Sequence, residues 1–260
     1  MINFFQNNRA HEQTKNYIEN ETDYRLVEQI GEGSYGVAYL LEHEKTKQQA
    51  VFKRLKEKHY HRRGLARFEQ EVQFMLLLKS LPIPQIIKAG TLEQVPFYMM
   101  SYVDGETFEH AIFERNATFS LNDTLHYTKK LLEILQQMHA NNIVHRDLRI
   151  ANIIVKNGQL TILDFGLATM IDPHFSIEAM KNPKEAPHPI SDLHAIGHFM
   201  LFLLYSTYKP ATKKSSPWQL ELQLPQDLQR FIERLLTIDQ PFLSCEDALE
   251  ELERLDVSEE

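Results

Sequence analysis

Two short motifs on either side of a hairpin signal constrain this chain most. The first reads His145-Arg146-Asp147-Leu148-Arg149-Ile150-Ala151-Asn152, and the second, Asp164-Phe165-Gly166, begins twelve residues after Asn152. Between them, two β-favouring runs flank Asn157-Gly158, a dipeptide typical of a two-residue hairpin turn. The pattern therefore predicts three oxygen-bearing side chains, those of Asp147, Asn152 and Asp164, on either side of a β-hairpin.

Composition indicates a soluble globular protein. With 260 residues, 43% of them hydrophobic, the chain can form one large domain or two lobes around a shared cleft. The only cysteine, Cys245, excludes an internal disulfide and cysteine-rich zinc sites, so we expect a cytoplasmic location. The first twenty residues lack the apolar core of a signal peptide. The longest apolar run, Ala195 to Tyr205, is too short to span a membrane and predicts a buried helix.

Charge is unevenly distributed along the chain. The formal net charge of -8 argues against general affinity for nucleic acid. However, Lys53 to Arg67 contains seven Lys or Arg and one Glu, whereas Gln219 to Glu260 contains twelve acids and three bases. We interpret the basic stretch as a solvated face; the alternative is a docking site for an acidic partner, for nucleic acid or for the chain's own acidic tail.

The first hundred residues are predicted to be mainly β, and the rest mainly helical. Strands are expected at Tyr24 to Ile30, Val37 to Leu41, Gln49 to Lys53 and Phe97 to Val103, with a helix at Leu65 to Lys79. Asp104-Gly105 is a turn signal and a plausible hinge. Later helices are expected from Ser120, as the N-cap, to Asn141, from Pro225 to Leu236, and after Ser244.

A glycine-rich turn lies between the first two expected strands. In Gly31-Glu32-Gly33-Ser34-Tyr35-Gly36, backbone N–H groups can approach a phosphate closely because no side chain intervenes at the glycines. A plain hairpin explains the same pattern, so its neighbours carry more weight. Lys53 ends the third strand, where a cation can reach phosphates, and Glu71 on the next helix can pair with it.

The two opening motifs supply what phosphoryl transfer requires. Asn152 and Asp164 offer hard oxygen ligands of the kind that magnesium prefers when phosphate oxygens complete its shell. Asp147 then remains as the carboxylate that orients an attacking hydroxyl and receives its proton.

With these motifs in this order and at this spacing, the chain resembles the eukaryotic-type (Hanks-type) protein kinases, in particular compact bacterial serine/threonine kinases, over about Tyr24 to Leu255. The resemblance implies an α+β, bilobal fold that uses ATP with Mg²⁺ or Mn²⁺ and acts on protein substrates. It implies an N-terminal extension at 1–22, an N-lobe at 23–103 and a C-lobe at 104–260. The catalytic residues implied are Asp147, Lys53 and Arg149, and the metal ligands are Asn152 and Asp164. The residues implied to bind ATP are Ile30, Gly31, Gly33, Gly36, Ala38, Val51, Lys53, Glu71, Met100, Ser101, Val103 and Ile154.

Other buried positions also match the family. His145, Phe165 and Met75 resemble its internal hydrophobic stack, and Asp192 resembles the aspartate that braces the catalytic loop. Glu69 is the rival of Glu71 for pairing with Lys53, but the surrounding sequence fits Glu71 better.

Several residues depart from the family pattern. Ala38 and Val51 exchange the usual Val and Ala, which conserves volume, so we expect ATP binding to survive. The segment from Asp164 to Asp192 is short, Glu185 is the nearest match to its usual glutamate, and the region that normally supplies the glutamate's arginine partner has none. Because both partners are missing together, we interpret this segment as remodelled.

Two arginines raise questions of control and specificity. Arg146 is typical of kinases ordered by phosphorylation, for which Thr169 and Ser176 are the candidate acceptors, with Asp172 or Glu178 as permanent substitutes. Arg149 stands where serine/threonine kinases usually have lysine, so tyrosine transfer stays open. A small-molecule phosphotransferase and a pseudokinase scaffold remain as alternatives.

Overall fold

The computed structural model describes residues 2–33, 35–209 and 216–255, with side chains from residue 9 onward. The chain divides into two compact units. Unit 1 comprises Met1–Lys79 and Pro84–Val103, and unit 2 comprises Ser80–Ile83 and Asp104–Glu260. We describe each unit by itself.

Unit 1 is built on an antiparallel five-stranded sheet of order β1-β2-β3-β5-β4. Its strands are β1 (Tyr24–Glu32), β2 (Gly36–His43), β3 (Gln49–Leu55), β4 (Ile86–Leu92) and β5 (Val95–Ser101). Its helices are α1 (Ile2–Glu21), the short 3₁₀ helix η1 (Glu57–His59) and α2 (Arg62–Leu77). The expected strands and the expected helix are all present, within a few residues of their predicted ends.

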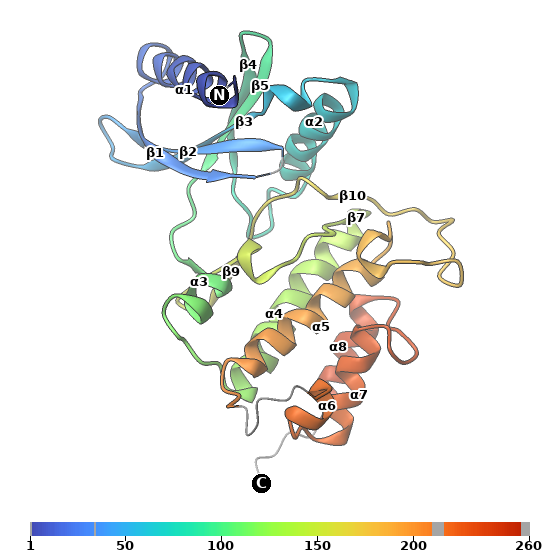
Figure 1. Ribbon diagram of the computed structural model, residues 1–260. Helices are drawn as coiled ribbons and strands as arrows, with labels where there is room; N and C mark the ends of the chain where they lie inside the picture. The colour runs from blue at the N-terminus through green and yellow to red at the C-terminus, as the bar shows by residue number, and fades with distance from the viewer. Residues whose placement is uncertain (1, 34, 210–215, 256–260) are drawn as a thin grey trace. The chain divides into compact units, whose positions relative to one another are not determined.

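One face of this sheet packs against α1, the dark blue helix in Figure 1. Alternate residues of the central strands, among them Tyr39, Phe52 and Phe97, form a buried cluster with Ile18 of α1, whose side chain is fully buried. Since side chains alternate between the two faces of a strand, the residues between these point to the opposite face.

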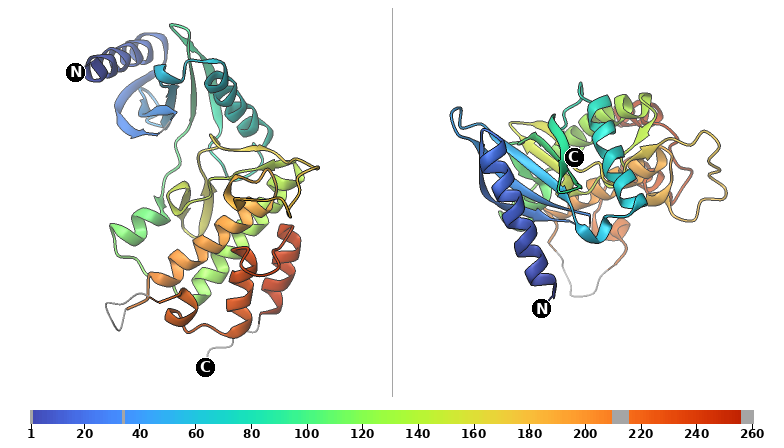
Figure 2. Two further views of the ribbon diagram at one scale, coloured as in Figure 1. Left: turned by 45° about the vertical axis from the view of Figure 1, so that its right-hand side comes forward. Right: turned by 90° about the horizontal axis from the view of Figure 1, so that it is seen from above.

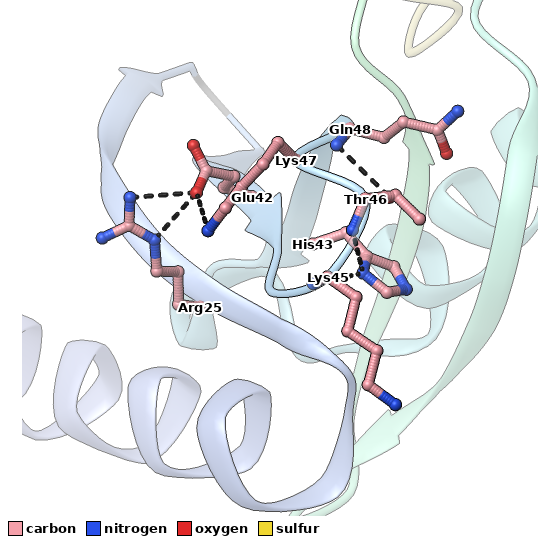
Figure 3. A network of polar contacts seen from close by, with 7 residues as sticks. All are labelled: Arg25, Glu42, His43, Lys45, Thr46, Lys47 and Gln48. Carbon is pink, nitrogen blue, oxygen red and sulfur yellow. Dashed lines mark hydrogen bonds and ion pairs between the residues drawn. The ribbon is translucent and has the colours of Figure 1, made fainter.

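The turn between β2 and β3 is held by polar contacts at both ends (Figure 3). Glu42 accepts hydrogen bonds from Arg25 on β1 and from Lys47 in the turn, and these two bonds lower the pKa of Glu42. The His43 ring nitrogen accepts from the backbone amides of Lys45 and Thr46. These contacts fix the register of β1, β2 and β3, on which the positions of the glycine turn and Lys53 depend.

Unit 2 is mainly helical. Its helices are α3 (Phe108–Phe113), α4 (Leu121–Ala140), α5 (Ile190–Tyr205), α6 (Trp218–Glu221), α7 (Gln226–Leu235) and α8 (Cys245–Arg254), with 3₁₀ helices η2 (Ile150–Asn152) and η3 (Pro183–Glu185). Its strands form two small sheets, β6 (Glu106–Thr107) with β8 (Ile153–Lys156) and β9 (Gln159–Ile162), and β7 (Ile143–Val144) with β10 (Thr169–Met170). Helices α4 and α5 run alongside each other at its centre (Figures 1 and 2).

The local signals in the sequence act as expected in unit 2. Ser120 and Asp123 form a capping box at the start of α4. Ser244 caps α8 by accepting from the amide of Asp247. Asn157 and Gly158 both have positive φ between β8 and β9, the conformation that a type I′ hairpin turn requires. The apolar run before Tyr205 lies in α5, which begins earlier, at Ile190, and is largely buried.

The structure adds one element and corrects one expectation. Helix α1 was not predicted from its polar sequence, and its Ile18 joins the core of unit 1. The basic stretch is not one solvated face, because Arg54 is only 3% exposed and donates to Ala10 O (2.7 Å) and Thr14 Oγ1 (3.0 Å) on α1. Lys56 is engaged within unit 1 as well, through an ion pair with Glu32 at 2.7 Å.

Candidate functional site

The second face of the sheet in unit 1 gathers the residues expected to hold a nucleotide. Directly opposite residues of antiparallel strands project to the same face. The ladder pairs Ala38 with Lys53, Val51 with Met100, and Gly31 with Ala38. These five positions therefore share one face, the one that does not carry α1.

The glycine turn connects β1 to β2 at the edge of this face. Gly33 N donates to Gly36 O at 3.0 Å, which closes the turn, and Ser34 lies outside the described residues. A Cβ on Gly36 would lie 3.0 Å from the carbonyl oxygen of Arg54, so β2 approaches β3 closely here and any other residue would be tightly packed. Ile30, just before the turn, is 45% exposed.

Lys53 is held by a side-chain pair with α2. Its Nζ lies 2.8 Å from Glu71 Oε1, and the same oxygen accepts a 2.9 Å bond from the hydroxyl of Tyr98. Glu71 is 4% exposed, whereas Glu69 is exposed. The expected ion pair is thus present with Glu71, and Tyr98 is a third member that the sequence did not reveal.

The end of β5 leads to the unit boundary. Met100 follows Tyr98 on the face that carries Lys53, since side chains two apart share a face. Ser101 ends the strand: its amide donates to Gln85 O, and its hydroxyl accepts from the amide of Gln85. Val103 is the last residue of unit 1.

In unit 2, a buried aspartate braces the loop that carries Asp147. Asp192 on α5 accepts from the backbone amides of His145 (2.9 Å) and Arg146 (2.8 Å), and pairs with His139 Nε2 (2.9 Å). Burial opposes its ionisation, but the bond and charge of His139, with His145 and the Arg146 amide, lower the pKa of Asp192. Arg146 has φ +66, a strained conformation for a non-glycine residue that these bonds hold in place. The predicted bracing role of Asp192 is confirmed.

Asp147 lies at the centre of a short hydrogen-bond network. Its amide donates to His145 Nδ1 at 3.2 Å, and its carboxylate accepts from Asn152 Nδ2 at 3.0 Å and pairs with Arg149 Nε at 3.0 Å. Asn152 Nδ2 also donates to Asp147 O at 2.8 Å. Because both bonds of Asn152 use the amide nitrogen, its side-chain oxygen keeps its lone pairs for a cation. The Asp147 carboxylate is positioned but still reachable, with 20% of the side chain exposed.

The Asp164 motif follows the hairpin directly. Asp164 adopts φ +59, and its Oδ1 accepts a 3.3 Å bond from the amide of Gly166. Phe165 is 1% exposed and its ring meets that of His145 edge to face at 4.9 Å, as expected for these two members of the internal stack. Met75, the third expected member, is buried in unit 1. Ile154 on β8 is 9% exposed.

The segment after Asp164 lies along unit 2 without the usual glutamate–arginine pair. Glu185 is exposed and accepts from Asn182 Nδ2 at 2.9 Å; among the ion pairs of the described residues, it has none. Of the candidate phosphoacceptors, Ser176 is exposed and donates to Glu178, whereas Thr169 is paired with Val144 between β10 and β7. The interpretation of a remodelled segment agrees with this geometry.

Sequence reasoning missed two residues behind Asp147. His139 on α4 joins Asp192 to Cys245 on α8, whose sulfur lies 3.4 Å from His139 Nδ1. Although Cys245, His139 and Asp192 are linked in this way, the Cys245 thiol is not a nucleophile, because burial raises its pKa. The available signal was His139 itself, near the end of α4 and just before the loop that carries Asp147. Its partner Asp192 lies 53 residues further along the chain, so the sequence did not show the contact.

Comparison with known proteins decides the family. Residues 24–184 match the model of the protein kinase domain. The chain belongs to the protein kinase family. It is 32% identical to the "Probable serine/threonine-protein kinase YbdM" of Bacillus subtilis. The match extends over 241 residues, which are 92% of this chain and 92% of that one.

Longer relatives match in part. The chain is 30% identical to "Sucrose non-fermenting protein kinase 1" of Fusarium virguliforme over 63% of this chain and 24% of that one. It is 29% identical to "Serine/threonine-protein kinase Nek6" of Oryza sativa over 73% and 38%. The chain therefore spans a quarter to two fifths of these two relatives.

Membership of the family establishes an α+β fold and an ATP-dependent protein kinase, for which ATP, a divalent metal and protein substrates are the general requirements. The described residues contain no group of three or more His, Cys, Asp or Glu side chains placed to hold a metal. In the same residues, no helix is both long and apolar enough to cross a membrane.

Proposed function

We propose that this protein kinase transfers the γ-phosphoryl group of ATP to serine and threonine hydroxyls of proteins, including its own. The observation that carries the proposal is the position of the Asp147 carboxylate, which is bonded by Asn152 and Arg149 while 20% of the side chain stays exposed. The bacterial and plant relatives are named serine/threonine-protein kinases, which supports the choice of hydroxyl.

Each half of the catalytic machinery has a proposed role. In unit 1, which we propose as the N-lobe, the glycine turn covers the phosphates and Lys53, fixed by Glu71, contacts them. The proposed contacts of adenine are Ile30, Ala38, Val51, Met100, Ser101, Val103 and, from unit 2, Ile154. In unit 2, proposed as the C-lobe, Arg149 contacts the transferring phosphoryl group.

The donor set of unit 2 fits a hard divalent cation. An amide oxygen from Asn152 and a carboxylate from Asp164 are ligands suited to Mg²⁺ or Mn²⁺, which complete their shells with phosphate oxygens and water. An ion held by these two residues would neutralise charge on the phosphates. As the P–O bond to the acceptor forms and the bond to the leaving diphosphate breaks, Asp147 receives the acceptor's proton.

The test is transfer of label from [γ-³²P]ATP with Mg²⁺ or Mn²⁺, followed by mapping of the phosphorylated residues. Wild type should label itself on serine or threonine, with Thr169 and Ser176 as the expected positions. Asp147→Asn should reduce transfer by about 10²- to 10⁴-fold, whereas Asp239→Asn, an exposed aspartate on unit 2, should not. Label on tyrosine would overturn the hydroxyl assignment. ATP binding without transfer to any protein would favour the scaffold or small-molecule reading.

Two further predictions stay with this proposal. A cytoplasmic location remains a prediction from the single cysteine. Docking of an acidic partner on the basic stretch is narrowed to its exposed residues, such as Arg62 and Arg63, because Arg54 is buried against α1. The acidic tail is partly engaged within unit 2, where Glu253 pairs with Lys129 at 2.7 Å, and residues 256–260 lie outside the described residues.

A further inference from the structure

A cavity of about 380 Å³ opens beside the Asp147 carboxylate, entirely within unit 2. Asp147 and Arg149 form one wall, and η3 contributes Lys184. The remaining walls come from α3 and α5, which supply Phe113 and Phe202. A second hollow of about 390 Å³ shares Phe113, Phe202 and His198 with the first and continues along α5. The two form one groove that starts at the catalytic carboxylate.

The far part of the groove is apolar and exposed. Phe113 is 59% exposed and Phe202 is 44% exposed, and their rings face each other edge to face with centroids 6.5 Å apart. Leu201 and Ile112 extend this surface. Large aromatic side chains left in contact with water next to an active carboxylate indicate a binding surface, since burying them on a partner is favourable.

Two histidines, His194 and His198, line the near part of the groove. His194 is 9% exposed and lines the cavity, and its Nδ1 has no hydrogen-bond partner among the described residues. Its ring stands 4.7 Å from that of His198.

The charge around the groove selects against basic ligands. Arg146, Arg149 and Lys184 line it, against the carboxylates of Asp147 and Glu109. Asp147 and Arg149 pair with each other, so the other charged residues of the lining are Arg146 and Lys184 against Glu109. A basic side chain here would face an excess of positive charge, whereas a carboxylate would be attracted.

We propose that this groove binds the acceptor segment of the protein substrate and selects a large apolar side chain, packed against the exposed rings of Phe113 and Phe202, with an acidic residue near Lys184. The inference rests on the proposed protein-directed transfer, because only a segment that reaches Asp147 presents its hydroxyl there. It adds the chemical class of the substrate: apolar and acidic around the acceptor, not basic.

The test uses pools of degenerate peptides around a central Ser/Thr, each with one residue fixed at one position, labelled with [γ-³²P]ATP and Mg²⁺. For wild type, pools with fixed Phe, Leu or Met at one position should be labelled about 10- to 100-fold more than pools with fixed Arg or Lys there. Phe113→Glu and Phe202→Glu should abolish this preference and favour the basic pools. Ile238→Glu, which replaces an apolar residue of the same 59% exposure outside the groove, should keep the wild-type preference.

The readout is a ratio within one variant, so it does not depend on the folded fraction. Equal labelling of apolar and basic pools by wild type, or an unchanged ratio in both groove variants, would overturn this inference and leave the proposed function standing. Label in no pool, with autophosphorylation that still requires Asp147, would also overturn the inference alone. Absence of any Asp147-dependent transfer would overturn both.

Discussion

The two units position their proposed catalytic side chains by different means. In unit 1, Lys53 pairs with the side chain of Glu71 on α2, which also accepts a hydrogen bond from Tyr98 on β5. In unit 2, a buried carboxylate on α5 holds the backbone on the amino side of Asp147. A side-chain pair is lost if one helix shifts, whereas backbone bonds to a buried aspartate break only when the surrounding fold opens. We therefore expect the position of Lys53 to change when α2 moves, and the backbone next to Asp147 to stay fixed as long as unit 2 is folded.

The largest effect should follow from removing the brace of unit 2. Asp192→Ala leaves the amides of His145 and Arg146 and the ring of His139 without their buried acceptor. We expect the free energy of unfolding to fall by about 3–5 kcal/mol, measured by urea unfolding at pH 7. Asp239→Ala, at an exposed aspartate, should change it by less than about 0.5 kcal/mol. A similar small change in Asp192→Ala would show that the loop is held by other contacts.

The helix α1 should prove to be part of unit 1 and not an appendage. Ile18→Ala removes a fully buried side chain from the cluster with Phe52 and Phe97. We expect a loss of about 2–4 kcal/mol in the free energy of unfolding, against little change for Ile238→Ala at an exposed site. If Ile18→Ala is as mild as its control, α1 does not contribute to the core.

This helix also shows where sequence reasoning stopped. Strands, glycine turn, capping boxes and the Asn157-Gly158 hairpin were predictable because each has a strong local signal. Helix α1 was not, because its buried face is narrow: among its described side chains only Thr14 and Ile18 are buried, and Thr14 contacts the guanidinium of Arg54 from β3. Strand β4 was missed because most of its residues, including Lys88 and Gly90, are exposed, so no alternation appears in the sequence.

The residues of the candidate site also fall into those that the sequence predicted and those that it did not. Lys53, Glu71, Asp147 and Asn152 were predictable from motif spacing, since the chemistry itself restricts residue types. Tyr98 and His139 were not, because their roles arise from partners far apart in sequence: Tyr98 lies 27 residues from Glu71, and His139 lies 53 from Asp192.

The pair in unit 1 should affect catalysis more than stability. Glu71→Gln weakens the charged bond to Lys53, and we expect phosphotransfer to fall by about 10- to 100-fold. Glu69→Gln, two residues earlier and exposed, is the matched control and should retain wild-type rates. Equal losses in both variants, measured by initial rates at saturating ATP, would contradict the assignment of Glu71.

The smallest effect concerns pH. Burial, together with His198 and Lys184, lowers the pKa of His194 from 6.5 to about 4, so the unfolded state binds its proton more readily. Stability is then fully present above pH 6.5 and lost as the pH falls towards 4, by about 2 kcal/mol between pH 7 and pH 5. Burial lowers the pKa of His198 as well, which acts in the same direction.

The pH effect can be isolated by substitution. In His194→Gln, the difference in the free energy of unfolding between pH 7 and pH 5 should shrink by that amount, whereas the exposed His174→Gln should leave it unchanged. A wild-type pH dependence in His194→Gln would show that the ring is not the group responsible.

Hydrogen exchange tests the contrast between the two units most directly. The amides of His145 and Arg146 should exchange only through global opening of unit 2, and they should already be strongly protected without ATP and Mg²⁺, because Asp192 holds them. Amides of α2 should exchange faster without nucleotide and slow when it is added. Rapid exchange at His145 and Arg146 that slows only with nucleotide would contradict the account, since the loop carrying Asp147 would then be ordered by its ligand and not by the fold.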